Sequence, residues 1–194
     1  MKYTIYLAMK KLSLVFIFLV PSLLFGQKSF SDSNYIFWSR DRPLQESDFQ
    51  IKVGHISNSY SFAQYNFDYN FQGTFAFGLP EDYKKKIRNY FIKSASWIDT
   101  AYDVSTSLKY QQTLFDLAEV YVRQFRKSVY DNRKKITWGK VKIDELNAQI
   151  LTSFSNRRVQ YDAATDFGAI ADKQKEWELL IAKELDNLKE FGAD

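Results

Sequence analysis

Carboxylates are plentiful in this sequence, and they are the side chains considered first for acid–base or metal chemistry. The chain has a single histidine, His55, and no cysteine. The lack of cysteine excludes thiol nucleophiles, cysteine-bound zinc and iron–sulfur clusters. One histidine cannot supply the multi-histidine ligand sets of zinc enzymes, and no glycine-rich phosphate loop or G-x-S-x-G motif occurs. We therefore expect His55 to be a surface or hydrogen-bonded histidine.

Two groups of carboxylates have spacings that could bring them together. Asp116 and Glu119 are three residues apart in a predicted helix and could share one face. Asp162 and Asp166 lie in a predicted turn before the last helix. These groups could supply a glycosidase-like acid–base pair, or a calcium site built from Asp116, Glu119 and Asp162. Solvated charges and helix caps are the simpler interpretation.

The first 26 residues have the pattern of a secretory signal peptide. Lys2, Lys10 and Lys11 precede the uncharged run LSLVFIFLVPSLLFG. This run is short for a membrane span of about 20 residues, and Pro21 interrupts it. Cleavage after Gly26 would leave residues 27–194, which we expect to form one periplasmic or extracellular domain. Because no cysteine is available for lipid attachment, no stable membrane anchor is expected after cleavage.

The charge of the exported part is nearly balanced. The whole chain has 27 basic and 23 acidic residues, a net charge of +4. Three of these lysines belong to the signal peptide, which has no acidic residue, so 24 basic and 23 acidic residues remain. No basic stripe with interleaved aromatic residues is evident, and we expect no nucleic-acid partner.

The first half of the exported part has the pattern of β-strands. Four aromatic residues from Tyr65 to Phe71 alternate with polar residues, and Phe75 and Phe77 continue the alternation. Further strands are expected near residues 60–62 and 87–92, with a turn at 79–82. An aromatic face of this kind could bind sugars or peptides, but it is more commonly the inner face of a sheet covered by helices.

The second half has the pattern of amphipathic helices. Apolar residues recur at three- and four-residue spacing from Leu114 to Val129 and from Ile170 to Leu188. Another helix is expected over 141–154, and residues 132–135 are expected to be a solvated helix end. Strands followed by helices predict an α+β fold, with a mainly antiparallel sheet and packed helices after it.

The order of several short segments resembles a bacterial family of predicted secreted zinc peptidases, domain of unknown function 922. The resemblance covers roughly residues 35–188 and implies a zincin-like fold with an H-E-x-x-H helix. It rests on four segments: Trp38-Ser39-Arg40-Asp41-Arg42-Pro43-Leu44 with Asp48-Phe49; Ser96-Trp97-Ile98; LKYQQTLFDLAEVYVR; and YDAATDFG followed by Gln174 and Trp177.

The chain departs from this family at each metal-binding and catalytic position that the resemblance implies. The segment aligned with H-E-x-x-H is Tyr110-Gln111-Gln112-Thr113-Leu114, and Phe167 occupies the position of a further histidine. Leu114 and Phe167 have no lone pair for zinc, and a neutral tyrosine is a poor ligand because its pKa is about 10. Gln111 cannot act as a general base. We therefore expect a degenerate HExxH-type helix with no catalytic residue, metal or cofactor.

These departures imply a catalytically inactive peptidase homologue that acts as a binding or scaffold protein outside the cytoplasm. A groove at the emptied site could hold a protein or peptide partner, for instance as an extended strand. We expect Trp97, Asp116 and Glu119 to lie near such a groove. Two alternatives stay open: a non-zinc hydrolase that uses Asp or Glu residues, and a purely structural envelope protein.

Overall fold

The computed structural model describes residues 34–51, 53, 60–71 and 78–193. Residues Ser31–Asp194 form one compact unit. The expected signal peptide, His55, Phe75 and Phe77 lie outside the described residues. Of the helices in the described part, none is both long enough and apolar enough to cross a membrane.

A three-stranded antiparallel sheet forms one layer of this unit. Its strands are β1 (Tyr35–Phe37), β2 (Ser61–Tyr69) and β3 (Ile87–Ile98), and β3 lies between the other two. The register of β2 on β3 shifts between Phe62 and Gln64. At this irregularity the Gln64 N–H donates to the Ser96 hydroxyl oxygen at 3.0 Å, so the amide is satisfied by a side chain.

The aromatic residues of β2 face the core, as their alternation predicts. Tyr65 belongs to the main core cluster, while Phe67 and Tyr69 pack against a second cluster. The strands expected separately near 60–62 and from Tyr65 onward are one continuous strand. The strand expected over 87–92 continues to Ile98, so Ser96, Trp97 and Ile98 do end a strand.

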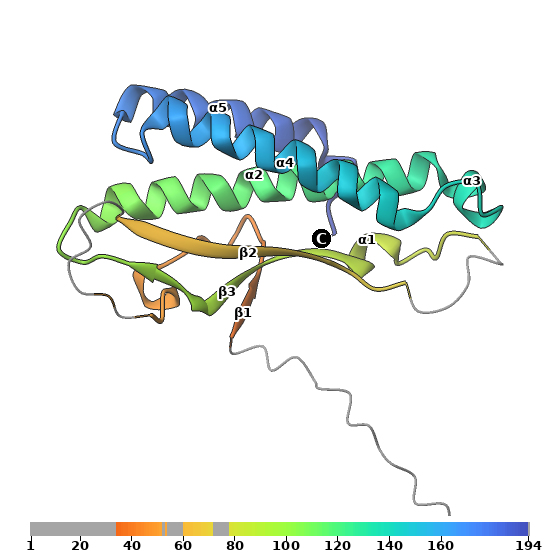
Figure 1. The fold of residues 1–194 in the computed structure, drawn as a ribbon, viewed down its shortest axis with the longest axis horizontal. Helices are drawn as coiled ribbons and strands as arrows, with labels where there is room; N and C mark the ends of the chain where they lie inside the picture. Colours follow the sequence, from red (N-terminus) through yellow and green to blue (C-terminus); the bar gives the residue numbers. More distant parts are fainter. Residues whose placement is uncertain (1–33, 52, 54–59, 72–77, 194) are drawn as a thin grey trace, which may run out of the picture. The chain divides into compact units, whose positions relative to one another are not determined.

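Helix α2 (Val104–Asp131) lies between the sheet and two further long helices, α4 (Ile143–Thr165) and α5 (Ala171–Asn187) (Figure 1). It packs on β2 and β3 with one side and on α4 and α5 with the other. As a result 15 of its 28 residues are buried, far more than the single stripe of a surface helix. The layers confirm the predicted α+β class.

Short helices complete the described part: η1 (Glu46–Asp48), α1 (Tyr83–Lys86), α3 (Arg133–Thr137) and η3 (Lys189–Phe191). The predicted helix end at 132–135 is confirmed for α2, which ends at Asp131 with Asn132 as its C-cap, and a short further helix, α3, begins at Arg133. The predicted end of a helix at residue 154 is wrong. α4 continues to Thr165, so Asp162 lies in a helix rather than in a turn.

Candidate functional site

The phenol of Tyr110, at the first expected zinc-ligand position, is committed to a neighbour on α4. Its side chain is buried, its hydroxyl donates to Asp162 Oδ1 at 2.6 Å, and its ring stacks on Tyr161 with 5.2 Å between centroids. Burial, and then the hydrogen bond to Asp162, raise the pKa of Tyr110 well above its usual value. A phenol held in this way stays protonated and does not offer zinc a charged oxygen.

Gln111, at the position of the general base, is turned toward the sheet. Its Nε2 donates to the Ser61 hydroxyl at 2.9 Å, and the Tyr65 hydroxyl lies 2.8 Å from both its Oε1 and its backbone carbonyl oxygen. Only 2% of Gln111 is exposed, so the amide serves as a buried link between α2 and β2. Leu114, at the second ligand position, is fully buried in the main core cluster.

Phe167 lies in the turn that ends α4, where the chain enters the left-handed backbone region. Its φ is 54°, Asp166 before it has φ 46°, and Gly168 after it has φ 91°. The Phe167 ring meets the edge of Tyr110 with 6.2 Å between centroids, yet 57% of Phe167 is exposed. The structure therefore brings Phe167 beside Tyr110, but the two rings supply only carbon and one protonated phenol to the site.

The side chains at the four substituted positions do not fit a zinc ion. Zinc requires imidazole, thiolate or carboxylate donors that converge on one point. Gln111 faces the sheet, Leu114 has no donor atom, and Tyr110 is occupied by Asp162. Within the described residues there is also no group of three or more His, Cys, Asp or Glu side chains that could hold a metal.

The calcium site considered as an alternative for Asp116, Glu119 and Asp162 is not formed in the described part of the chain, where each carboxylate has its own partners. Asp162 accepts from Tyr110 and lies 3.6 Å from the Arg158 guanidinium. Asp116 accepts from an indole and an amide, and Glu119 accepts from two guanidinium groups. The three groups are thus used separately to join elements of the fold.

Asp116 fixes the segment before β2 to the middle of α2. Its Oδ1 accepts from Trp38 Nε1 at 2.8 Å and from Gln112 Nε2 at 2.9 Å. Gln112 Oε1 in turn accepts from the Leu44 N–H at 2.7 Å. Burial raises the pKa of Asp116, and the hydrogen bonds from Trp38 and Gln112 oppose this shift. Nearby, Asp48 forms a two-bond pair with Arg42, at 2.7 and 2.8 Å.

Glu119 lies at the centre of a buried ionic network. Its Oε1 accepts from Arg123 Nε at 3.1 Å and from Arg126 Nη1 at 2.8 Å, and all three side chains are at most 4% exposed. Arg126 also donates to the Ile87 carbonyl oxygen, and Arg123 donates to that of Leu185. The network therefore joins α2 to β3 and α5, and this structural role leaves no carboxylate oxygen of Glu119 pointing into the groove described below.

Trp97 lies apart from the other candidate residues. It pairs with Phe62 on β2 and forms an isolated bridge with Ile51. The next residue, Ile98, belongs to the core cluster under α2, and side chains of a strand alternate between its faces. Trp97 is therefore on the face of the sheet that points away from α2.

An open groove follows the exposed side of the N-terminal half of α2, and we call it the α2 groove. Three adjoining hollows of about 210, 230 and 390 Å³ make it up. Thr106 lines the first two hollows, and Lys109 and Glu178 line the second and third. The first hollow is lined mainly by aromatic rings: Tyr60, Tyr102 and Phe167. The third contains the apolar side chains of Pro43, Leu44 and Leu108 and, besides Glu178, a second carboxylate, Asp116.

Two of the expected site residues, Phe167 and Asp116, thus line the groove, while Tyr110, Gln111, Leu114 and Trp97 line none of its hollows. The sequence did not identify Tyr60, Tyr102, Lys109 or Glu178. These residues come from separate elements, and no spacing along the chain signals that they meet. With rings at one end, charges of both signs in the middle and apolar groups at the other end, the groove is suited to an extended ligand of mixed polarity.

Comparison of the chain with protein-family models, with characterised proteins and with solved structures finds no match. The likeness to secreted zinc peptidases therefore rests on the sequence segments alone.

Proposed function

We propose that this chain is an exported, catalytically inactive peptidase homologue that binds a peptide segment of a partner protein in the α2 groove. One observation carries the proposal. The positions that would hold the metal and the base are filled by packed and hydrogen-bonded side chains, while an open groove lies directly beside them.

The lining of the groove supports a peptide as its ligand. Tyr60 and Tyr102 meet edge to face with 4.4 Å between centroids, and the exposed ring of Phe167 lines the same hollow. Such a hollow suits an aromatic or large aliphatic side chain. Lys109 and Glu178 line the adjoining hollow, where they offer a cationic donor group and an anionic acceptor group to a peptide's polar groups.

The first test is zinc binding by the purified chain that begins at Gln27. Elemental analysis and titration calorimetry should give no stoichiometric zinc, because the donor atoms at the four positions are missing or occupied. A tightly bound equivalent of zinc would mean that the aligned positions are wrong, and a search for peptidase activity would follow.

The second test is selection of ligands from a peptide display library. We expect selected peptides to share an aromatic anchor, and Phe167→Ala to weaken their binding by about tenfold or more, as truncation of an anchor contact does. Val159→Ala is the matched control, because Val159 is equally exposed, at 63% against 57%, and does not line the groove. Equal affinities of the two variants would contradict the groove as the binding site.

A hydrolase that uses carboxylates is the second candidate, because Asp116 and Glu178 line the same hollow of about 390 Å³. The raised pKa of Asp116 suits a general acid, and Glu178 would be the partner carboxylate. Glycan and peptide substrates should then be cleaved in the presence of a chelator. Loss of this turnover in both Asp116→Asn and Glu178→Gln would establish a hydrolase in place of a binding protein, and absence of turnover would exclude it.

A further inference from the structure

A second surface, at the opposite end of α2 from the α2 groove, combines positive charge with exposed aromatic rings. We call it the basic–aromatic end, and it consists of Tyr130, Arg133, Lys134, Lys135, Trp138 and Lys140. These residues belong to the last turn of α2, to α3 and to the turn that follows. In Figure 1, α3 lies at the end of the helical layer where α2 finishes and α4 starts.

Positive charge is concentrated in this short segment of residues 27–194. Residues 130–142 contain five basic residues and one acidic residue, and the rest of residues 27–194 contains 19 basic and 22 acidic residues. The single acid, Asp131, is paired with Lys127. Arg133, Lys134, Lys135 and Lys140 form no ion pair with a carboxylate in the described part of the chain. A balanced total charge therefore conceals a local positive surface, which the sequence interpretation missed.

The aromatic members of this surface are presented to solvent beside the cations. Trp138 is 66% exposed, more than any other large apolar side chain of the described residues. Lys140 Nζ lies 5.3 Å from the centroid of the Trp138 ring, and the Arg133 guanidinium lies 4.2 Å from that of Tyr130. This end of the molecule therefore presents aromatic ring surface and positive charge side by side.

The turn that carries Trp138 is well defined. The Lys140 N–H donates to the Lys135 carbonyl oxygen at 2.8 Å, and the Gly139 N–H donates to that of Ile136 at 2.9 Å. With Gly139 at φ 67°, this is the Schellman pattern of a helix C-terminus. Ile136 is buried in the second core cluster and anchors the turn. Trp138 and Lys140 are thus held outward before any partner arrives.

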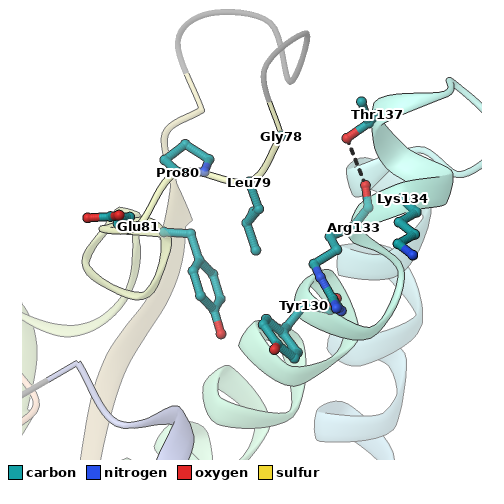
Figure 2. Close-up of a pocket in the computed structure, with 9 residues that line it drawn as sticks. Gly78, Leu79, Pro80, Glu81, Tyr130, Arg133, Lys134 and Thr137 are labelled. Atoms are coloured by element: carbon teal, nitrogen blue, oxygen red, sulfur yellow. Dashed lines mark hydrogen bonds between the residues drawn. The ribbon is translucent and has the colours of Figure 1, made fainter.

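A hollow of about 420 Å³ opens beside this surface, between the 78–83 turn and α3. Figure 2 shows Leu79 entering it from one side and Tyr130 and Arg133 from the other. The carboxylate of Glu81 points away from Arg133 in this view, so it does not neutralise the guanidinium. The hollow has room for an anionic group, and its Arg133 and Lys134 lining is suited to phosphate oxygens.

We propose that the basic–aromatic end docks this domain on an anionic phospholipid bilayer, with Trp138 at headgroup level. Lysine and arginine stems with charged tips beside a tryptophan are the side chains that bilayer interfaces favour. Lipid phosphates would meet Lys134, Lys135 and Lys140, while the hollow at Arg133 accepts one headgroup. The attachment is peripheral and reversible, and it does not depend on what the α2 groove binds.

Vesicle sedimentation with the chain that begins at Gln27 tests this inference. That chain retains the compact unit Ser31–Asp194 and lacks the apolar N-terminal run, which would bind lipid by itself. Vesicles with one third phosphatidylglycerol should bind the protein, pure phosphatidylcholine vesicles should not, and added salt should weaken the binding. Trp138 fluorescence should shift to the blue on binding, and this shift should be absent in Trp138→Ala.

Variants that remove positive charges identify the part of the protein surface that contacts the vesicle. Each lysine close to an anionic surface contributes about fivefold to partitioning, so Lys134→Gln with Lys135→Gln should lower it about 25-fold. Lys183→Gln on α5, an exposed lysine outside this surface, is the control and should leave partitioning unchanged. Equal binding to both lipid mixtures, equal effects of the control, or binding to soluble polyanions without vesicle binding would each overturn the proposal. Melting temperatures of all variants should match, since the altered side chains are exposed.

Discussion

At the scale of single residues, Asp116 is a buried acceptor whose chemistry is set by two neutral donors. The Trp38 indole and the Gln112 amide both donate to one oxygen of its carboxylate. Neutral donors stabilise the ionised form less than a cation would, and burial raises the pKa of Asp116. The group is thus a candidate acid in the groove and at the same time a structural link.

Because Asp116 joins Trp38 to α2, we expect Asp116→Ala to lower thermal stability. The indole N–H of Trp38 would lose its acceptor in a part-buried place, at a cost of about 1–3 kcal/mol. Differential scanning calorimetry measures the effect. An unchanged melting temperature would show that the Trp38–Asp116 contact contributes nothing.

The raised pKa of Asp116 predicts a particular dependence on pH. A group whose pKa is higher in the folded state adds stability at pH values below its unfolded pKa, about 3.9, and this stability is lost as pH rises through the folded pKa. Asp116→Asn keeps an acceptor oxygen but cannot titrate. Urea unfolding from pH 3 to pH 7 should therefore show wild type losing stability relative to Asp116→Asn as pH rises, and parallel curves would contradict the shift.

Alanine substitutions at two glycines should distinguish the cost of backbone strain from the cost of a steric clash. Gly168 and Gly139 both have positive φ, 91° and 67°, but a Cβ on Gly168 would lie 2.9 Å from Tyr110 Cβ, while one on Gly139 meets nothing within 4 Å. In both alanine variants the free energy of unfolding should fall by about 1 kcal/mol, because a residue with a Cβ disfavours positive φ. Gly168→Ala should lose about 1–3 kcal/mol more, because the α4–α5 turn must move away from α2. Equal losses in chemical denaturation would refute the close packing of this turn.

At the scale of elements, α2 packs against both the sheet and the α4–α5 pair. The Glu119 network provides its most extensive buried polar contacts to neighbouring elements. Arg126 reaches the carbonyl oxygens of Ile87 on β3 and Phe191 in η3, and Arg123 reaches that of Leu185 on α5. One carboxylate thus pairs with two guanidinium groups that join three segments distant in the sequence.

Glu119→Gln should therefore destabilise the fold strongly. It removes the negative charge that the two buried arginines share, and breaking a buried pair costs about 3–5 kcal/mol. Asp131→Asn is the control, because it breaks an i,i+4 pair with Lys127 whose side chains are about half exposed, and such pairs contribute less than about 1 kcal/mol. Guanidinium unfolding of both variants makes the comparison, and similar losses would mean that the network is not effectively buried.

The helices and strands could be predicted from the sequence where one face of the element is apolar. They could not be predicted elsewhere. The spacing of Leu114, Leu117 and Phe125 located α2 almost to its ends, because that helix packs tightly. The second half of α4 was missed, because its residues Asn156 to Gln160, none of which is buried, show no apolar period. Its end depends on the backbone of Asp166 and Phe167, which adopt positive φ without being glycine.

At the scale of the whole molecule, the described unit should unfold as one cooperative body. Tyr65, Leu114 and Tyr161 come from the sheet, α2 and α4, yet they belong to one core cluster. Neither layer can keep its apolar face covered without α2. Far- and near-ultraviolet circular dichroism of the chain that begins at Gln27 should give coincident thermal transitions, and two separated transitions would contradict the shared core.

The candidate site shows the same limit of sequence reasoning at this scale. The expected metal positions were identified by the resemblance, and of these Tyr110 and Phe167 do meet. Trp97 was placed near them by the same resemblance, and strand alternation sends it to the other face. The groove and the basic–aromatic end arise from residues brought together by the fold, which no local pattern records.

Contacts between the N-terminal and C-terminal segments of the described unit affect the order in which the unit folds. Trp38 lies under Arg123, whose guanidinium also binds the Leu185 carbonyl oxygen, and Arg40 pairs with Asp186. The segment that follows β1 therefore gains these contacts only after α5 is available. During synthesis, this segment would stay incompletely packed until α5 emerges, and the docking of α5 would be a late step of folding.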